Sequence, residues 1–331
     1  MNNISVLHIV QNNGITNMGY NDFYLFCKNK FVDCVYLFED GVDRGLIKSF
    51  FLFSKMFYKH LKDANVIHYH SHQLVIISQV INKLSFFNIK SIYTIHTSYE
   101  NLKGKNKLLF LLNFFLVNKV VFCSKSSYLS FPKIIRENKK SCYIVNGVDF
   151  EIKPFDNIKY GFISVGRLIS LKRIVNVISI YLSGKFKNKL NVVGAGDKST
   201  EIKEMLKGNY DVNIHGLLPR HEVLKLLLKS KYYISYSSIE GMPISVLEAI
   251  SMGCVPILSN IEPHNEIFSM GIKGFIVNNE NELKNALVQC ELMTDFEFYN
   301  IIDNNIIVLK NEFSLKTMHE KYYREYAELL L

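Results

Sequence analysis

Short apolar runs alternate with helix-like segments along almost the whole sequence, and this alternation constrains the fold more than any other feature. ISVLHIV near the N-terminus is followed by a helix-like segment near residues 19–29, then CVYLF, a helical stretch at 46–62 and NVIHYH. Parallel strands are joined by crossovers that are usually helices, so this order predicts βαβ units. The same rhythm restarts after Pro154 with GFISVG and a helix from about residue 171. The sequence therefore predicts an α/β protein with two parallel sheets.

The length and the position of turn residues indicate how these sheets are divided between domains. The chain has 331 residues, of which 48% are hydrophobic. A chain of this length and apolar content exceeds a single hydrophobic core of ordinary size, so it fits two domains. An Asn-Gly turn signal, polar residues and Pro154 mark a boundary at 146–160. We expect an N-terminal domain over 1–153, a C-terminal domain over 154–313, and a terminal helix over 314–331 that packs back on the N-terminal domain.

Targeting signals and charge indicate where the chain works and which partners it lacks. The sequence begins directly with a strand-like run, and its longest apolar run, Leu108 to Val117, is shorter than the roughly 20 residues of a membrane span. We therefore expect a cytoplasmic protein. The net charge is +9, but the lysines are scattered and no nucleic-acid-binding motif is present, so no nucleic-acid partner is expected. Two segments, 46–62 and 103–119, interleave Lys with Phe and Leu, which fits either core-facing helices or peripheral contact with the inner membrane.

A cationic cluster follows the first strand of the C-terminal half. In SVGRLISLKR the strand ends at Gly166, and Arg167, Lys172 and Arg173 stand at the start of the next helix. Cations at a helix N-terminus oppose the helix dipole unless an anion joins them. Strand, glycine, cations and backbone N–H groups together suit a diphosphate, while a solvated surface cluster is the alternative interpretation.

Two carboxylates follow a later strand. The segment SSIEGMPISVLEAISMG contains Glu240 on the expected loop and Glu248 within the expected helix, with Pro243 suited to the first helical position and Gly253 to the position after the helix. On a helix, positions eight apart lie about 80° apart in rotation, so both carboxylates are expected to face one cleft. Carboxylates at the carboxyl end of a parallel strand suit the hydroxyls of a sugar and a ribose.

These motifs together resemble glycosyltransferase family 4, which has the GT-B fold of two Rossmann-like domains facing across a cleft. The resemblance rests on VGRL-x3-K, HG at His215-Gly216, EGMPISVLEA and G-x-V-P-I in the C-terminal half. In the N-terminal half NVIHYHSH, YTIH, VVFCS and IVNGVD follow the family's order. The resemblance implies a retaining glycosyltransferase that moves a hexose or N-acetylhexosamine from a UDP- or GDP-sugar to a glycan acceptor. That acceptor is expected to be linked to a lipid diphosphate, in the synthesis of O-antigen, capsule or lipopolysaccharide.

The resemblance also implies roles for individual residues. Arg167 and Lys172 would neutralise the donor diphosphate, replacing a metal ion, so no cofactor is expected. Glu248 would bind the ribose, Glu240 the hydroxyls of the transferred sugar, and His96 would lie beside that sugar. The groups that act in catalysis would thus be Glu240, His96, Arg167 and Lys172. The remaining nucleotide-sugar site would comprise Gly14, Gly166, Gly196, His215, Gly216, Gly241, Met242, Pro243 and Ile244.

Two other functions fit parts of the sequence. A sugar-nucleotide-binding protein without transfer, either a partner subunit or an epimerase, would keep the donor motifs. A metal-dependent hydrolase would use His68, His70 and His72, which alternate along a strand and would point to one side. No carboxylate follows these histidines closely, and the six cysteines contain no CxxC pair, so no metal site is expected.

Overall fold

The computed structural model describes residues 4–11, 29–39, 46–149 and 159–331, without the side chains of residues 11, 34–39 and 46–52. Gly14 and most of the helix expected near residues 19–29 lie outside the described residues. By their internal contacts, the described residues up to Asn146 form one compact unit together with Leu315–Leu331, and Gly147–Ser314 form the other. This change of unit falls inside the segment 146–160 in which the sequence places a boundary.

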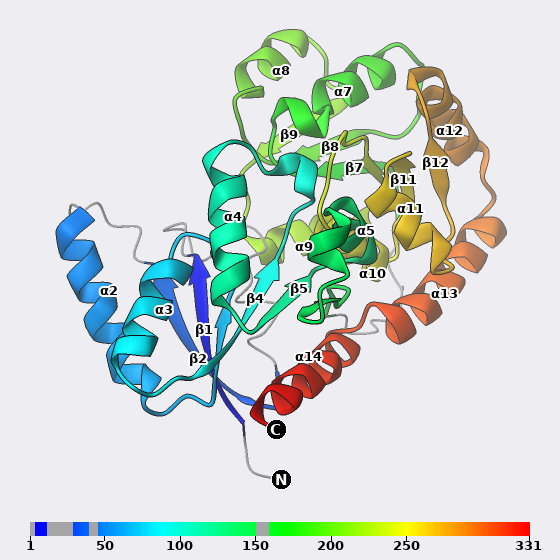
Figure 1. Cartoon of the computed structure of the whole chain (residues 1–331). Helices are drawn as coiled ribbons and strands as arrows, with labels where there is room; N and C mark the ends of the chain where they lie inside the picture. The colour runs from blue at the N-terminus through cyan, green and yellow to red at the C-terminus, as the bar shows by residue number, and fades with distance from the viewer. Residues whose placement is uncertain (1–3, 12–28, 40–45, 150–158) are drawn as a thin grey trace. The chain divides into compact units, whose positions relative to one another are not determined.

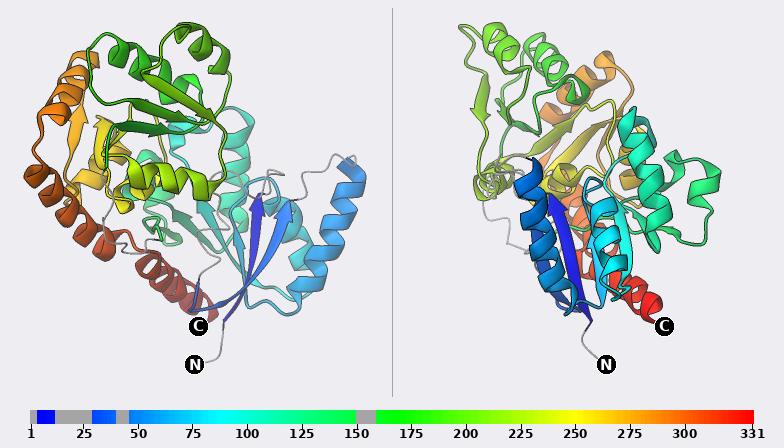
Figure 2. Two further views of the ribbon diagram at one scale, coloured as in Figure 1. Left: turned by 180° about the vertical axis from the view of Figure 1, so that it is seen from behind. Right: turned by 60° about the vertical axis from the view of Figure 1, so that its left-hand side comes forward.

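The first unit is built on a parallel sheet with the strand order β2-β1-β3-β4-β5-β6 (Figure 1). Helices α2, α3 and α4 form a layer in which α3 packs against both neighbours, and α2 runs along β2, as the two views of Figure 2 show. Its core includes Phe57, Tyr69, Phe110, Phe122 and Phe131, all almost fully buried. The strands are β1 (Ser5–Gln11), β2 (Asp33–Glu39), β3 (Val66–Tyr69), β4 (Lys90–Ile95), β5 (Lys119–Phe122) and β6 (Ser141–Tyr143). The helices are α2 (Leu46–Leu61), α3 (Val75–Leu84), the 3₁₀ turn η1 (Tyr99–Asn101), α4 (Lys105–Leu116), α5 (Lys125–Ser130), α6 (Lys133–Arg136) and α14 (Leu315–Leu330).

The second unit has a parallel sheet with the strand order β12-β11-β10-β7-β8-β9. Its core includes Phe162, Val177, Leu190, Tyr232 and Phe298. The strands are β7 (Phe162–Val165), β8 (Leu190–Val193), β9 (Val212–Gly216), β10 (Tyr232–Ser235), β11 (Val255–Ser259) and β12 (Phe275–Val277). The helices are η2 (Ser170–Lys172), α7 (Ile174–Leu182), α8 (Ser199–Met205), α9 (Arg220–Lys229), α10 (Ile244–Ser251), α11 (Glu262–Ser269), α12 (Glu280–Leu292) and α13 (Asp295–Glu312).

Strands and helices form where the apolar runs place them, because β-branched and aromatic residues fill a sheet that is covered on both faces. The four residues of β10, for example, are all buried. Two parallel sheets in an α/β chain are therefore confirmed. Among the described residues, no helix combines the length and the apolar character that a bilayer span requires.

Candidate functional site

The carboxyl ends of β7 and β10 form the switch point of the second sheet. From β7 the chain builds outward through β8 and β9, and from β10 it builds the other way through β11 and β12. At such a point the two loops diverge, and open α/β sheets bind ligands in the crevice between them. Arg167 and Lys172 follow β7, and Glu240 follows β10. The topology therefore brings the two sequence clusters to one place.

Hydrogen bonds hold these two loops together. Ser238, after β10, donates from its backbone N–H and from its hydroxyl to the carbonyl of Leu171, at 2.9 and 3.1 Å. The hydroxyl of Tyr233 on β10 lies 3.1 Å from the carbonyl oxygen of Val165 and 2.9 Å from the hydroxyl of Ser245 on α10. The loops after β7 and β10 are thus fixed to each other by several polar contacts.

Lys172 and Glu240 form an ion pair at this place, and both side chains are largely shielded from solvent. Arg167 is different, because its side chain is exposed and makes no ion pair or hydrogen bond with the residues that the structure describes. The loop after β7 therefore carries two cations before α7. Lys172 is paired with a carboxylate, and Arg167 faces solvent.

Glu248 has a cationic partner that the sequence did not reveal. Its Oε1 accepts from Nε of Arg220 at 2.8 Å and lies 2.7 Å from Nη2 of the same side chain. Glu248 is only 6% exposed, and burial raises the pKa of its carboxyl while the Arg220 guanidinium opposes that rise. Both contacts go to Oε1, and none of the described residues donates to Oε2. Arg220 opens α9, 28 residues away in sequence, and no local pattern links the two.

The rotation expected between Glu240 and Glu248 is wrong. Helix α10 begins at Ile244, with Pro243 at the N-cap rather than at the first helical position, so Glu240 is on the loop and outside the helical periodicity. Each carboxylate has its own cation, Lys172 or Arg220. The position of Gly253 after the helix is confirmed, since its φ of 75° is the left-handed conformation that glycine accepts without strain.

The glycines after β7 and β8 let two loops approach closely. A Cβ on Gly196 would lie 2.3 Å from the carbonyl oxygen of Leu168, and a Cβ on Gly194 would lie 1.8 Å from that of Gly166. Either distance is shorter than real Cβ contacts allow. Gly196 therefore has a structural reason to be glycine, because it lets the loop after β8 lie against the loop that carries Arg167.

Other residues predicted for this site follow the carboxyl ends of strands in the same sheet. His215 and Gly216 end β9, where the His215 ring lies 2.9 Å from the Asn191 side chain. Gly241, Met242 and Pro243 lead into α10, which begins at Ile244. The backbone N–H of Ile244 donates to the carbonyl of Met242 at 2.9 Å.

His264 on α11 is near enough to Lys172 and Glu240 for their charges to act on its pKa, and it was not found from the sequence. Its Nδ1 lies 2.8 Å from the carbonyl oxygen of Ser259, so this nitrogen carries the proton of the neutral ring. Burial lowers the pKa of His264 to about 4, and the nearby Lys172 also lowers it, while Glu240 opposes the shift. His264 is therefore a neutral imidazole at neutral pH, with Nδ1 bonded to the carbonyl of Ser259.

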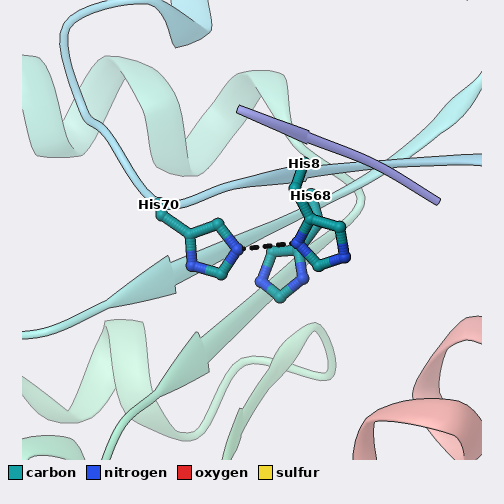
Figure 3. A group of neighbouring side chains, drawn as sticks. All are labelled: His8, His68 and His70. Atoms are coloured by element: carbon teal, nitrogen blue, oxygen red, sulfur yellow. Dashed lines mark hydrogen bonds between the residues drawn. The ribbon is translucent and has the colours of Figure 1, made fainter. Parts of the chain in front are cut away.

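A cluster of buried histidines occupies the switch point of the first sheet. His8, His68 and His70 bring ring nitrogens within 4.8 Å of one another, and Figure 3 shows the hydrogen bond between His8 and His70. The grouping expected from the sequence, His68 with His70 and His72, is wrong in one member. Strand β3 ends at Tyr69, so the alternation does not extend to His72, whereas β1 pairs with β3 in a register that sets His8 beside His68.

The contacts of His68 fit a hydrogen-bonded cluster better than a metal centre. Its Nδ1 lies 2.7 Å from the hydroxyl of Tyr326 on α14, and its Nε2 lies 2.7 Å from the hydroxyl of Thr94 on β4. Thr94 is in turn 2.9 Å from the hydroxyl of Tyr322. A metal bound to His68 would displace one of these hydroxyls. The candidate group also contains no carboxylate or thiolate to offset a buried dication.

Comparisons with known proteins agree with this geometry. Residues 147–306 match the family model of glycosyl transferases group 1. The capsular polysaccharide biosynthesis glycosyltransferase CapH of Staphylococcus aureus is 29% identical over 238 residues, which span 66% of this chain and 66% of CapH, just under two thirds of its length. An Escherichia coli UDP-Gal:alpha-D-GlcNAc-diphosphoundecaprenol alpha-1,3-galactosyltransferase is 26% identical over 287 residues, or 75% of this chain and 71% of that protein.

A similar solved structure is that of Anabaena HepE in complex with UDP and glucose. It superposes with a TM-score of 0.78 at 14% identity, over 98% of this chain and all of HepE. The architecture of two Rossmann-like parallel-sheet domains, which the resemblance implied as GT-B, is confirmed. The residues that match the glycosyl transferases group 1 model coincide with the second unit, where the two cation–carboxylate pairs lie.

Proposed function

We propose that this chain is a glycosyltransferase that moves a hexose or N-acetylhexosamine from a nucleotide sugar to a glycan acceptor in surface-polysaccharide synthesis, with retention of configuration. The observation that carries the proposal is the pairing of Lys172 with Glu240 and of Arg220 with Glu248 at the switch point of the second sheet. A diphosphate needs cations, and a ribose and a sugar need carboxylates that can accept from vicinal hydroxyls. This place offers both beside the exposed Arg167.

In this proposal the ion pairs hold the site ready before the donor binds. Lys172 balances Glu240 until the diphosphate supplies another anion, and Glu240 then accepts from sugar hydroxyls. Arg220 keeps one oxygen of Glu248 occupied, so Oε2 meets the ribose. Arg167 and Lys172 stabilise the leaving nucleoside diphosphate electrostatically, as donors fixed before the reaction do. His96 lies beside the transferred sugar, and no metal ion is required.

We propose a UDP-sugar, rather than a GDP-sugar, as the donor. One relative acts on a UDP-Gal donor by its name, and the similar HepE structure holds UDP. The proposed acceptor is a lipid-diphosphate-linked glycan, by analogy with the diphosphoundecaprenol acceptor in the name of the same relative. The reaction would then take place on the cytoplasmic side of the inner membrane.

Nucleotide binding tests the proposal directly. Thermal denaturation with UDP, GDP and their sugars should show the largest rise in Tm with a UDP compound, since a ligand at 100 times its Kd stabilises a fold by about 2.7 kcal/mol. Glu248→Ala and Arg167→Ala should each weaken UDP binding by about 1–3 kcal/mol, the scale of hydrogen bonds to charged groups. Lys225→Ala, which removes an exposed ion pair with Glu222 on α9, is the matched control and should bind UDP as the wild type does. Unchanged affinity in both site variants would reject the assignment.

Transfer of the sugar to an acceptor distinguishes a glycosyltransferase from a partner subunit or an epimerase. Incubation with UDP-sugars and lipid-diphosphate-linked acceptors should give a glycosylated product, and EDTA should leave the rate unchanged. Release of UDP with no glycosylated acceptor under any condition, or conversion of one UDP-sugar into its epimer, would favour the alternative.

We also propose that the α2–α4 layer of the first unit contacts an anionic membrane. On α4 the side chains of Leu108, Leu111, Leu112 and Phe115 recur at the spacing of one helical face, and all are exposed, between 41% and 76%. The opposite face buries Phe110 and Phe114, so this helix is apolar on both sides. Exposed apolar stripes of this kind mark contact surfaces.

The surroundings of α4 favour a lipid surface as its partner. Phe86, in the turn after α3, is 91% exposed and has a φ of 62°, a conformation that is strained for a bulky residue. Phe87 beside it contacts the ring of Tyr58 on α2. Exposed lysines, including Lys55, Lys59, Lys83, Lys103 and Lys105, flank these side chains. Apolar side chains edged by lysines suit the boundary between lipid headgroups and acyl chains.

Flotation with vesicles tests the membrane contact. The wild type should float with vesicles that contain anionic lipid and remain in solution with neutral vesicles. Leu111→Ser with Phe115→Ser should abolish flotation, whereas Val288→Ser with Leu292→Ser, an equally spaced exposed pair on α12, should not. Equal flotation of both double variants, or none by the wild type, would reject the contact.

A further inference from the structure

A closed network of hydrogen bonds joins the carboxyl ends of β10 and β11 to the first turn of α11. Nδ1 of His264 lies 2.8 Å from the carbonyl oxygen of Ser259, the last residue of β11, and 3.2 Å from its hydroxyl. The Ser259 hydroxyl donates to the carbonyl of Ser237 at 2.6 Å. The hydroxyls of Ser237 and Ser235 lie 3.3 Å apart, and that of Ser235 lies 3.5 Å from Nε2 of His264. The network therefore begins and ends on the same imidazole.

The carbonyl of Ser259 fixes the arrangement of hydrogens in this network. A carbonyl oxygen only accepts, so Nδ1 of His264 carries the hydrogen of the neutral ring and Nε2 is an acceptor. Nε2 then accepts from the hydroxyl of Ser235, whose oxygen accepts from the hydroxyl of Ser237. The hydroxyl of Ser259 directs its hydrogen to the carbonyl of Ser237. One tautomer of His264 therefore satisfies every contact.

Burial makes this arrangement specific. The side chains of Ser235, Ser237, Ser259 and His264 are all buried. A buried polar group without a partner is costly, whereas a network in which each donor meets an acceptor favours a single arrangement. An apolar side chain would fill the same space without joining the backbone on either side. The network is therefore suited to fixing the backbone at the ends of β10 and β11.

The backbone that is fixed in this way leads directly to Glu240. On the β11 side, the carbonyl of Ser237 accepts from the network. On the β7 side, the next residue, Ser238, donates from its backbone N–H and its hydroxyl to the carbonyl of Leu171 in η2. Glu240 then pairs with Lys172 of the same turn. The loop after β10 is therefore held from both sides two to three residues before its carboxylate.

We propose that His264 is a positioning residue for the donor sugar, because through Ser259 and Ser235 it holds the start of the loop that places Glu240. This inference rests on the proposed role of Glu240 as the acceptor for hydroxyls of the transferred sugar. Only two residues separate Ser237 from Glu240, so a shift of the backbone at Ser237 displaces the carboxylate. A loop that is ordered before the sugar arrives loses little freedom on binding, which favours affinity.

Nitrogen NMR of ¹⁵N-histidine-labelled protein tests the network without any ligand. Ring ¹⁵N shifts distinguish a protonated nitrogen from an unprotonated one, and the His264 signals are assigned through their bonds to the backbone. We expect a protonated Nδ1 and an unprotonated Nε2 at pH 7. The opposite tautomer, a mixture of both tautomers or an imidazolium would overturn the inference.

Hydrogen exchange measures whether the network holds the loop. The amide of Ser238 reports on the bond between this loop and η2. Ser259→Ala removes the hydroxyl that donates to Ser237, and the Ser238 amide should then exchange about fivefold faster. Ser230→Ala is the matched control, since it removes another buried hydroxyl of the second unit that donates to a backbone carbonyl, at 2.8 Å, and it should leave this rate unchanged. An unaltered rate in Ser259→Ala, or an equal increase in the control, would overturn the inference.

Two variants of His264 separate hydrogen bonding from the filling of space. His264→Phe keeps a ring but removes both of its bonds, so exchange of the Ser238 amide should accelerate. His264→Asn keeps an N–H donor in the place of Nδ1 and should retain most of the wild-type protection. The amides of β8 should keep their rates in both variants. Equal acceleration in β8 would mean a general loss of stability and would contradict the positioning role, and Ser259→Ala tests the network even if His264→Phe does not fold.

Ligand binding connects the network to the donor. His264→Phe should weaken binding of a UDP-sugar about fivefold, the scale of one hydrogen bond, and His264→Asn should recover most of that affinity. The affinity for UDP should not change, because Arg167 and Glu248 are outside the network. Equal losses for UDP and the UDP-sugar would contradict the positioning role. If the wild type binds no nucleotide sugar, the proposed function fails, whereas the tautomer and exchange results still decide whether His264 holds the loop.

Discussion

The two units share an all-parallel sheet of similar order, yet their switch points hold opposite kinds of polar groups. In the first unit, neutral imidazoles and hydroxyls bond to one another, as in the contacts of His68 with Thr94 and Tyr326. In the second unit, Lys172 and Arg220 are each paired with a carboxylate. In both units the strand order determines where polar side chains cluster, namely at the switch point. The types of residue at that point determine whether it can bind a charged ligand.

Lowering the pH should destabilise the first unit more than the second, and this is the largest difference that we expect between them. The pKa of His8 is lowered from 6.5 to about 3 by burial, so the unfolded state binds a proton more readily than the folded state in this range. Stability is therefore complete above pH 6.5 and falls as the pH decreases, by about 2 kcal/mol for His8 alone at pH 5. His68 and His70 have pKa shifts in the same direction.

Hydrogen exchange at pH 7 and pH 5, corrected for the intrinsic rate, would measure this loss in each unit. We expect the first unit to lose more protection, because the second unit contributes chiefly His264, whose pKa is lowered less, to about 4. Equal losses in both units would break the comparison.

Removal of Arg220 should have the next largest effect. Arg220→Met leaves the buried Glu248 carboxylate without its cation, and we expect a loss of about 2 kcal/mol in the free energy of unfolding. The pKa of Glu248, already raised by burial, should rise further. Denaturant unfolding near pH 7 measures the loss, and adding Glu248→Gln to this variant should recover part of it. Lys225→Met, at an exposed pair, should cost less than about 0.5 kcal/mol.

The smallest effect is expected on α14. Tyr326→Phe removes the hydroxyl that lies 2.7 Å from Nδ1 of His68, and we expect a loss of about 1 kcal/mol. Thermal denaturation would detect it as a decrease in Tm. Tyr210→Phe, at a tyrosine that is 81% exposed, makes the same chemical change and should leave Tm unchanged. A similar decrease in both variants would show that the hydroxyl of Tyr326 contributes nothing specific.

Local patterns in the sequence were enough to predict the fold class and much of the candidate site. Apolar runs identified the strands, and the turn residues after β7 and β10 identified the loops that carry Arg167, Lys172 and Glu240. These signals are local, because each depends on residues within one strand–loop–helix segment.

Contacts between segments could not be read in the same way. Arg220 meets Glu248 because α9 and α10 pack together, and His8 joins the histidine cluster because of the register between β1 and β3. His72 was grouped wrongly because the end of a strand is poorly marked in sequence. Register and helix packing depend on the whole fold, so these partners become visible only in three dimensions.

The placement of α14 in the first unit has a consequence for synthesis on the ribosome. His68 finds its Tyr326 partner in a segment translated only after all of Gly147–Ser314. The second unit can therefore complete its core during translation, while the first unit waits for the final helix. Order of emergence and order of completion are thus reversed in this chain, and His68 and Thr94 of a nascent first unit do not meet Tyr326 and Tyr322 until translation reaches α14.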